Sequence, residues 1–112
     1  ASSSSGSTIH QHHQQVTSYN GQQALRHLIE VYLKRGSAYQ YSSHNEQALR
    51  DYSRVIELCP QDVRGYYMRA TLLDQMERYG DAVADYGRVI RLDPRHHIAR
   101  SRLEALESKL HQ

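Results

Sequence analysis

Apolar and polar residues follow a helical period from about Gln22 to the end of the chain. In the first stretch, apolar or small residues recur at steps of three and four positions: Leu25, Leu28, Ile29, Tyr32, Leu33, Gly36 and Tyr39. This spacing places them along one face of a helix. The pattern therefore predicts a long amphipathic helix over about 22–42.

The same period continues after short polar breaks. It predicts further helices over about 46–58, 63–76, 80–92 and 97–110. Pro60 and Pro94 follow the second and fourth of these helices, and a proline cannot continue a helical hydrogen-bond ladder. The chain is therefore expected to be all-α, with about five helices.

The helical pattern repeats with a period of 34 residues. Aligning 29–62 with 63–96 needs no gap and gives ten identities. The identical pairs are Tyr32 and Tyr66, Arg35 and Arg69, Ala48 and Ala82, Asp51 and Asp85, Tyr52 and Tyr86, Arg54 and Arg88, Val55 and Val89, Ile56 and Ile90, Leu58 and Leu92, and Pro60 and Pro94. A fixed period of this length indicates a stack of similar helical units.

The repeated residues resemble the tetratricopeptide repeat family. Its signature places an aromatic, a small residue and a second aromatic on one helix, then alanine, an aromatic and proline on the next. The matching residues are Tyr32, Gly36, Tyr39, Ala48, Tyr52 and Pro60, then Tyr66, Ala70, Leu73, Ala82, Tyr86 and Pro94. The resemblance implies antiparallel helix-hairpin repeats, a fragment of an α-solenoid, with repeats 29–62 and 63–96 and a capping helix over 97–111.

Three departures from the family pattern change the expected packing. Arg35 and Arg69 stand where the family has an apolar residue, and Leu73 replaces the second aromatic. Only two units are present, whereas a stable stack usually needs about three. We expect the long first helix, the capping helix, a partner or a second copy of the chain to compensate.

The first twenty residues have a different composition. Residues 1–20 are rich in Ser, then in Gln and His, and cannot bury enough apolar surface to offset the cost of ordering. We expect a disordered tail or linker there, followed by one domain over 21–112. Biased composition explains His10, His12 and His13 better than a metal site, because an unstructured tract offers no fixed ligand geometry.

Composition and charge narrow the classes of function. The net charge is +2 with His neutral, and the arginines near the capping helix belong to no recognised nucleic-acid motif, so we expect no nucleic-acid partner. No apolar stretch is long enough for a membrane span. Cys59 is the only cysteine, which excludes a disulfide within the chain and favours a reduced, cytoplasmic compartment.

The sequence offers no candidate catalytic site and no cofactor motif. It contains no glycine-rich phosphate loop, no HExxH or GxSxG motif and no paired-cysteine zinc spacing. Catalysis needs such groups held in fixed geometry. We therefore expect a chain that is not an enzyme, with no cofactor and no bound metal.

By resemblance to the family, the first helices of successive repeats line a groove that holds a segment of another protein. The positions that face this groove are Glu30, Leu33, Lys34, Ser37 and Tyr41, then Arg64, Tyr67, Met68, Thr71 and Gln75, with Ser101 and Arg102 on the capping helix. Basic, aromatic and adaptable side chains mix on this surface, as an acidic or carboxylate-bearing peptide would require. For each charge taken singly, plain solvation is the alternative.

Some relatives bind the C-terminal carboxylate of chaperones through a clamp of basic and asparagine side chains. Here Leu33 and Ser37 take the places of the first lysine and asparagine, Met68 takes a basic place, and a third repeat is missing; Arg64 alone matches. Chaperone-tail binding is therefore a minor alternative. The main alternative is self-association, because a short stack leaves apolar ends that a second copy can cover.

Overall fold

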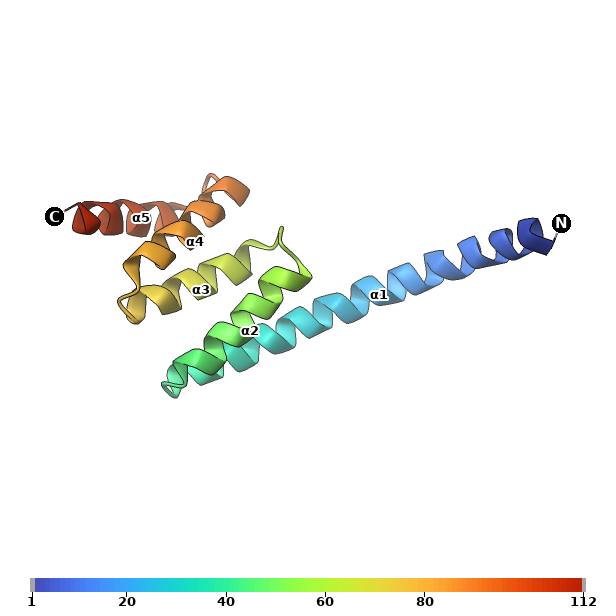
Figure 1. Ribbon diagram of the computed structural model, residues 1–112, viewed down its shortest axis with the longest axis horizontal. Coiled ribbons are helices and arrows are strands. Elements are labelled where there is room, and N and C mark those ends of the chain that lie inside the picture. Colours follow the sequence, from blue (N-terminus) through green and yellow to red (C-terminus); the bar gives the residue numbers. More distant parts are fainter. Residues whose placement is uncertain (1, 112) are drawn as a thin grey trace. The chain divides into compact units, whose positions relative to one another are not determined.

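The computed structural model describes the backbone of residues 2–111 and the side chains of residues 20–111 (Figure 1). The helices are α1 (Ser2–Tyr41), α2 (Asn45–Leu58), α3 (Val63–Gln75), α4 (Tyr79–Leu92) and α5 (His97–Leu110). No strand occurs within these described residues. The chain divides into two units, 1–30 and 31–112, which are described separately.

The first unit consists of the N-terminal part of α1. The apolar period predicted a helix from about Gln22, whereas α1 begins at Ser2. The earlier start has a simple reason: residues 2–21 contain no proline, so no residue there interrupts helical hydrogen bonding. The side chains of 1–19 lie outside the described residues, and the disordered tail over 1–20 stays a prediction.

The second unit contains two helical hairpins whose turns have the same geometry. Ser43 and Glu77 are equivalent residues of the two repeats, and each has a positive φ, 65° and 63°. The backbone N–H of His44 donates to the carbonyl of Tyr39 at 2.8 Å, and that of Arg78 donates to the carbonyl of Leu73 at 2.9 Å. These hydrogen bonds, each between residues five positions apart, satisfy carbonyls at the ends of α1 and α3, as in a Schellman motif.

Small residues let the two helices of each hairpin approach closely. A Cβ placed on Gly36 would lie 2.7 Å from Cε1 of Tyr52, whose side chain is fully buried. Ala48 and Ala82 are also fully buried, on α2 and α4. The tyrosine of the second helix fills the space that these small residues leave.

Two core clusters stabilise the second unit. The smaller contains Ala48, Tyr52 and Leu72, from α2 and α3. The larger joins α3, α4 and α5, and its buried members are Ala70, Leu73, Ala82, Tyr86, Val89, Ala99 and Leu106. The predicted capping helix therefore supplies part of the larger core, which is how two repeats form a stable end.

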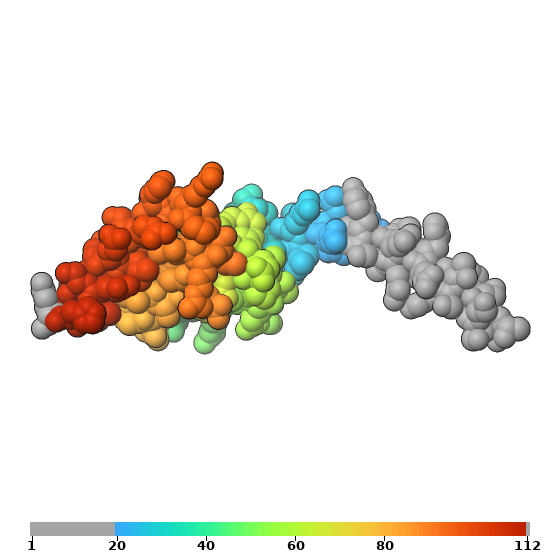
Figure 2. Space-filling model, turned by 90° about the horizontal axis from the view of Figure 1, so that it is seen from above, coloured from blue at the N-terminus to red at the C-terminus, as the bar shows by residue number. Residues whose placement is uncertain are grey.

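α5 contacts the hairpin before it near both of its ends, and at the first end the ring of its N-cap, His96, packs against Tyr67 of α3. Its first N–H groups are capped by His96, whose Nδ1 accepts a hydrogen bond from the backbone N–H of Ala99 at 3.1 Å. Near its C-terminus, Lys109 lies over the ring of Tyr79, 4.4 Å from the centroid. The space-filling view shows α5 covering α4 without a gap (Figure 2).

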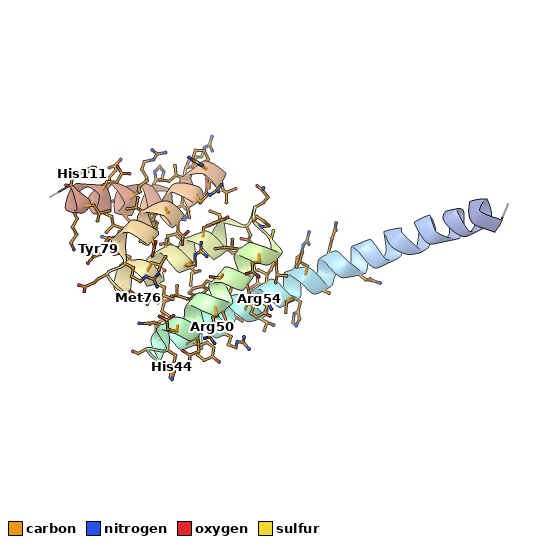
Figure 3. All side chains as sticks on the ribbon, viewed as in Figure 1. His44, Arg50, Arg54, Met76, Tyr79 and His111 are labelled. Carbon is orange, nitrogen blue, oxygen red and sulfur yellow. The ribbon has the colours of Figure 1, made fainter. Side chains whose placement is uncertain are left out.

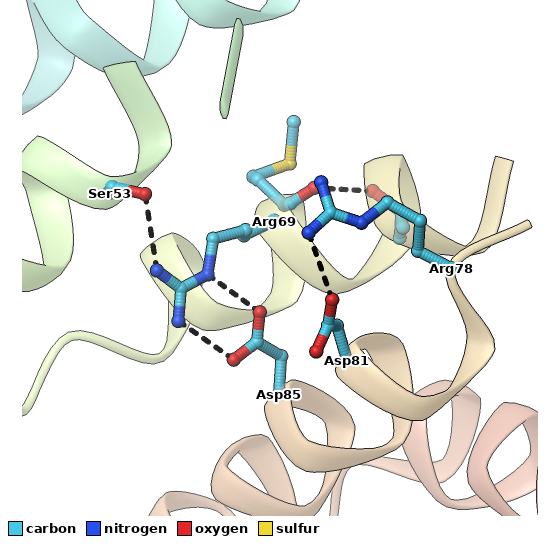
Figure 4. A network of polar contacts seen from close by, with 7 residues as sticks. Ser53, Arg69, Arg78, Asp81 and Asp85 are labelled. Atoms are coloured by element: carbon cyan, nitrogen blue, oxygen red, sulfur yellow. Dashed lines mark hydrogen bonds and ion pairs between the residues drawn. The ribbon is translucent and has the colours of Figure 1, made fainter. Parts of the chain in front are cut away.

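The two arginines that depart from the family pattern make equivalent ion pairs. Arg35 binds Asp51 through Nε and Nη2 at 2.9 and 2.7 Å, and Arg69 binds Asp85 at 2.7 and 2.9 Å. Arg69 also donates to Oγ of Ser53 at 3.1 Å (Figure 4). Each arginine therefore satisfies a buried carboxylate of its own hairpin, and the identities at Arg35 and Asp51 and their equivalents form one repeated unit.

Candidate functional site

A hollow of about 270 Å³ lies between the first helices of the two hairpins. The segment of α1 over 31–41 contributes three side chains and α3 contributes three. The lining residues are Ser37, Gln40, Tyr41, Met68, Thr71 and Gln75. None of these side chains carries a formal charge, and the exposed fraction of Tyr41 reaches 90%.

A chain of hydrogen bonds crosses the hollow from the core to the surface. The hydroxyl of Tyr52 donates to Oε1 of Gln40 at 2.8 Å, and Nε2 of Gln40 donates to Oε1 of Gln75 at 2.8 Å. Burial, with a smaller contribution from the charge of Asp51, raises the pKa of Tyr52 to about 12. The tyrosine is therefore a proton donor at neutral pH, which fixes the order of donors and acceptors along the chain.

The second repeat has an ionic version of the same contact. The hydroxyl of Tyr86 donates to Oδ2 of Asp74 at 3.4 Å, and Arg102 of α5 binds the same oxygen through Nε and Nη2 at 2.9 and 2.6 Å. Burial, followed by the charge of Asp74, raises the pKa of Tyr86 to about 12. The guanidinium of Arg102 is thus held against α3.

Arg64 is likewise held by a residue of its own chain. Asp62 caps α3 by accepting from the backbone N–H of Arg64 at 3.0 Å, and its carboxylate binds the Arg64 guanidinium at 2.8 and 3.1 Å. These hydrogen bonds hold the pKa of Asp62 below its usual value. Only 15% of the Asp62 side chain is exposed, so the carboxylate stays beside the guanidinium.

The structure divides the predicted groove residues into two sets. Ser37, Tyr41, Met68 and Thr71 come together in the hollow. The other four lie outside its lining: Lys34, Arg64, Tyr67 and Arg102.

Those four differ in their surroundings. Lys34 is exposed, while Arg64 and Arg102 are ion-paired. The ring of Tyr67 packs against Tyr86 and His96, with centroid distances of 6.3 and 4.7 Å. The assignment of all eight residues to partner binding stays a prediction.

Sequence reasoning missed the residues that control the charge of this surface. Gln40 was not expected to face the groove, although it lies three positions after Ser37 on the same helix. Asp62 and Asp74 were not recognised as counterions. Asp62 had a signal, because an aspartate two residues before an arginine at a helix start is typical of an N-cap. Asp74 had none, since its partner is 28 residues away.

A second hollow, of about 390 Å³, lies on the other side of α3. Leu49, Ser53, Arg69, Asp81 and Asp85 are among its lining residues. Arg69 and Arg78 are ion-paired there with Asp85 and Asp81 (Figure 4). Arg69 and Asp85 thus join α3 with α4, whereas Arg78 and Asp81 pair within the start of α4.

Two further features, a metal site and a helix able to cross a membrane, are absent from the described residues. No group of three His, Cys, Asp or Glu side chains with the arrangement of a metal site occurs in this part of the chain. No helix within it is both long and apolar enough to cross a membrane. Along α2 the exposed side chains include Arg50 and Arg54, the latter ion-paired with Glu57 at 3.1 Å (Figure 3).

Comparison with known families agrees with the helix-hairpin geometry. A tetratricopeptide repeat model matches residues 29–62 and 63–96, more than half of the chain. The chain belongs to the tetratricopeptide repeat family. The matched residues are the two repeats identified by the period of 34.

Two curated relatives match this chain over a small part of their own length. A UDP-N-acetylglucosamine–peptide N-acetylglucosaminyltransferase of Giardia intestinalis is 35% identical over 65 residues, which cover 58% of this chain and 4% of the transferase. Human DnaJ homolog subfamily C member 7 is 31% identical over 71 residues, which cover 63% of this chain and 14% of the homolog. This tetratricopeptide chain thus spans a small part of either relative.

Solved structures of tetratricopeptide domains superpose well on the chain. The TPR2B domain of yeast Sti1, in a complex with an Hsp70 peptide, is 28% identical with a TM-score of 0.68, covering 74% of this chain and 66% of that one. The first TPR of Spaghetti (RPAP3), bound to HSP90 peptide SRMEEVD, has a TM-score of 0.68 at 20% identity, with coverage of 88% and 90%. The TPR domain of Arabidopsis OM64 has a TM-score of 0.66 at 22% identity, with coverage of 82% and 87%. The chain is a protein-interaction module of this family.

Proposed function

We propose that the chain binds a segment of a partner protein in the groove along its first helices, at the hollow between α1 and α3. One observation carries this proposal: four side chains expected to face the groove, Ser37, Tyr41, Met68 and Thr71, meet in one hollow. A hollow of this kind, with an exposed aromatic beside an adaptable thioether, suits an extended chain. No catalysis is part of the proposal, because the glycosyltransferase relative matches over the repeats alone.

A pair of matched substitutions tests this site. Gln75→Trp fills the hollow with an indole, while Gln47→Trp places the same side chain on an exposed position of α2, outside the hollow. The immobilised chain and both variants are incubated with a degenerate heptapeptide library with blocked termini, and the retained peptides are quantified. Retention lost in Gln75→Trp and kept in Gln47→Trp supports the site. Equal retention by both variants rejects it.

Self-association is a second candidate, favoured by apolar exposure on α5. Ile98 and Leu110 are 61% and 51% exposed, although both are large apolar side chains of the capping helix. A second copy would cover them. Light-scattering mass measured against concentration tests this, with Ile98→Ser/Leu110→Ser as the matched variant. A monomer at all concentrations contradicts it.

Binding of an acidic segment, including a chaperone tail, is a third candidate because two of the similar domains are seen with chaperone peptides. Lys34 is its main support, as an exposed cation one turn before Ser37. The peptide SRMEEVD serves as the probe. Affinity that is lost in Lys34→Glu and weakens with salt would favour this candidate.

All three candidate functions are compatible with the reduced cytoplasm as the location of the chain. Cys59 is its single cysteine and is free, as is usual for proteins of that compartment.

A further inference from the structure

The two arginines of the groove surface already have acidic partners within the chain. Arg64 and Arg102 are the only arginines expected to face the groove, and each forms a close ion pair, with Asp62 and with Asp74. Both aspartate side chains are 15% exposed, so they cannot swing away freely to admit another carboxylate. At distances beyond a few ångströms each pair behaves as neutral, which removes the attraction for an acidic segment.

The hollow offers uncharged hydrogen-bond donors instead of cations. Within the described part of the chain, Nε2 of Gln75 has no hydrogen-bond partner, while its Oε1 is occupied by Gln40. The position of the Gln75 amide is fixed, because the same chain of hydrogen bonds continues to the buried hydroxyl of Tyr52. An amide held in this way is a ready donor to a carbonyl oxygen.

The other lining groups include apolar surface and one hydroxyl that is already hydrogen-bonded. Met68 and Tyr41 present a thioether and an exposed ring, and the hydroxyl of Thr71 donates to the carbonyl of Met68 at 2.8 Å. Lys34 lies one turn away on α1 and does not line the hollow. The hollow therefore combines an apolar surface with amide donors in a neutral setting.

We propose that this hollow selects an extended, uncharged protein segment, and that Asp62 and Asp74 act as internal counterions that keep acidic segments out. The segment would place a backbone or side-chain carbonyl against the Gln75 amide and an apolar side chain between Met68 and Tyr41. This inference rests on the proposed function. It assigns a role in specificity to two aspartates that do not line the hollow.

The test changes the counterions without changing the shape of the site. Asp62→Asn keeps an N-cap acceptor, and Asp74→Asn keeps an acceptor for Tyr86. The double variant therefore removes the Asp62 carboxylate from Arg64 and the Asp74 carboxylate from Arg102 at little cost to the fold, which a thermal melt verifies. The matched control is Glu57→Gln/Asp81→Asn, which adds the same charge by releasing Arg54 and Arg78, two arginines whose ion pairs lie outside the hollow.

The readout is the composition of peptides retained from a degenerate heptapeptide library with blocked termini. We expect the natural chain and the control to retain uncharged peptides and to deplete Asp and Glu. In Asp62→Asn/Asp74→Asn we expect the retention of acidic peptides to rise about tenfold, because the surface loses the two negative charges that lie beside Arg64 and Arg102. That gain should shrink as salt is raised.

Three results overturn the inference, and the first two of them leave the proposed function standing. Enrichment of acidic peptides by the natural chain, blocked by Gln75→Trp, would mean that the groove binds but that the aspartates do not exclude acids. No change between the double variant and the natural chain would reject the counterion role. Retention of no peptide at all would reject the groove proposal and this inference with it.

Discussion

The two repeats pack their helices in the same way, but the side chain that accepts a hydrogen bond from the buried tyrosine differs between them. In the first repeat the buried Tyr52 donates to Gln40, which is joined to Gln75 of the next first helix. In the second repeat Tyr86 donates to Asp74, which is joined to Arg102 of the capping helix. Gln40 and Asp74 are equivalent positions, 34 residues apart. One position is thus an amide in the first repeat and a carboxylate in the second.

This difference distinguishes the residues that determine the packing of the repeat from those that determine the polarity of its surface. The alanines, the tyrosine and the buried aspartate are the same in both repeats and fix the hairpin. The polar partner of the tyrosine varies, and it decides whether the contact with the next helix is neutral or ionic. The neutral contact lies in the hollow, and the ionic contact joins α3 to the cap.

The largest expected loss of folding stability comes from replacing the buried tyrosine of each repeat. Tyr86→Ala opens a cavity in the larger core cluster, which includes residues of α5, and should cost about 4 kcal/mol. Tyr52→Ala acts on the smaller cluster and should cost about 3 kcal/mol, near the lower end for a large aromatic. Chemical denaturation followed by circular dichroism gives both free energies of unfolding. A larger loss for Tyr52→Ala would contradict the view that the second repeat and its cap form the main core.

The arginine–aspartate ion pair should contribute more to the stability of the second repeat than to that of the first. Arg69 is 27% exposed and also binds Ser53, whereas Arg35 is 55% exposed and has no such contact among the described residues. Arg69→Met leaves Asp85 buried without its counterion, and should cost about 2 kcal/mol after allowance for partial exposure. Arg35→Met should lower the melting temperature less, because the guanidinium of Arg35 is more exposed and its attraction to Asp51 is more strongly screened by water.

A double variant shows whether the unpaired carboxylate causes that loss. Arg69→Met/Asp85→Leu removes both charges, and should recover most of the stability that Arg69→Met loses. Thermal melts of the single and double variants provide the comparison. If the double variant is no more stable than Arg69→Met, the loss comes from packing of the arginine side chain and not from the buried charge.

Alkaline pH should act on both repeats through their buried tyrosines. Folding raises the pKa of Tyr52 and of Tyr86 from 10 to about 12, so the stabilisation is complete below pH 10 and is lost as the pH rises toward 12. Tyrosinate absorbance and circular dichroism, followed over that range, should change together. Asp74→Asn sharpens the comparison, because it should lower the pKa of Tyr86 alone. If the pKa of Tyr52 decreased as well, the two repeats would titrate as one unit.

The sequence predicted the packing residues well, because these repeat. The period of 34 located both hairpins with the small residues at Gly36 and Ala48, and the apolar pattern located the last helix, all of which the structure contains. It did not predict which cations are neutralised. The contact between Asp74 and Arg102 joins residues 28 positions apart on different helices, and no local pattern encodes it. The groove therefore stays a prediction, and the sequence did not indicate that Arg64 and Arg102 are ion-paired within the chain.

The smallest expected effect concerns the turns, where the two repeats are most alike. Ser43 and Glu77 both have a left-handed backbone, which strains a residue with a Cβ. Ser43→Gly and Glu77→Gly remove this strain, while the flexibility of glycine in the unfolded chain offsets part of the gain.

Each substitution should therefore raise stability by about 0.5 kcal/mol, and by the same amount in both repeats, because the turn bonds to Tyr39 and Leu73 are equivalent. Thermal melts of the two single variants measure this, with Gly80→Ala as a control on a helical glycine that has open space around its Cβ. A gain at Glu77 alone would show that the turn of the first repeat relaxes more readily than that of the second. The two hairpins would then differ in their backbone as well as in their polar contacts.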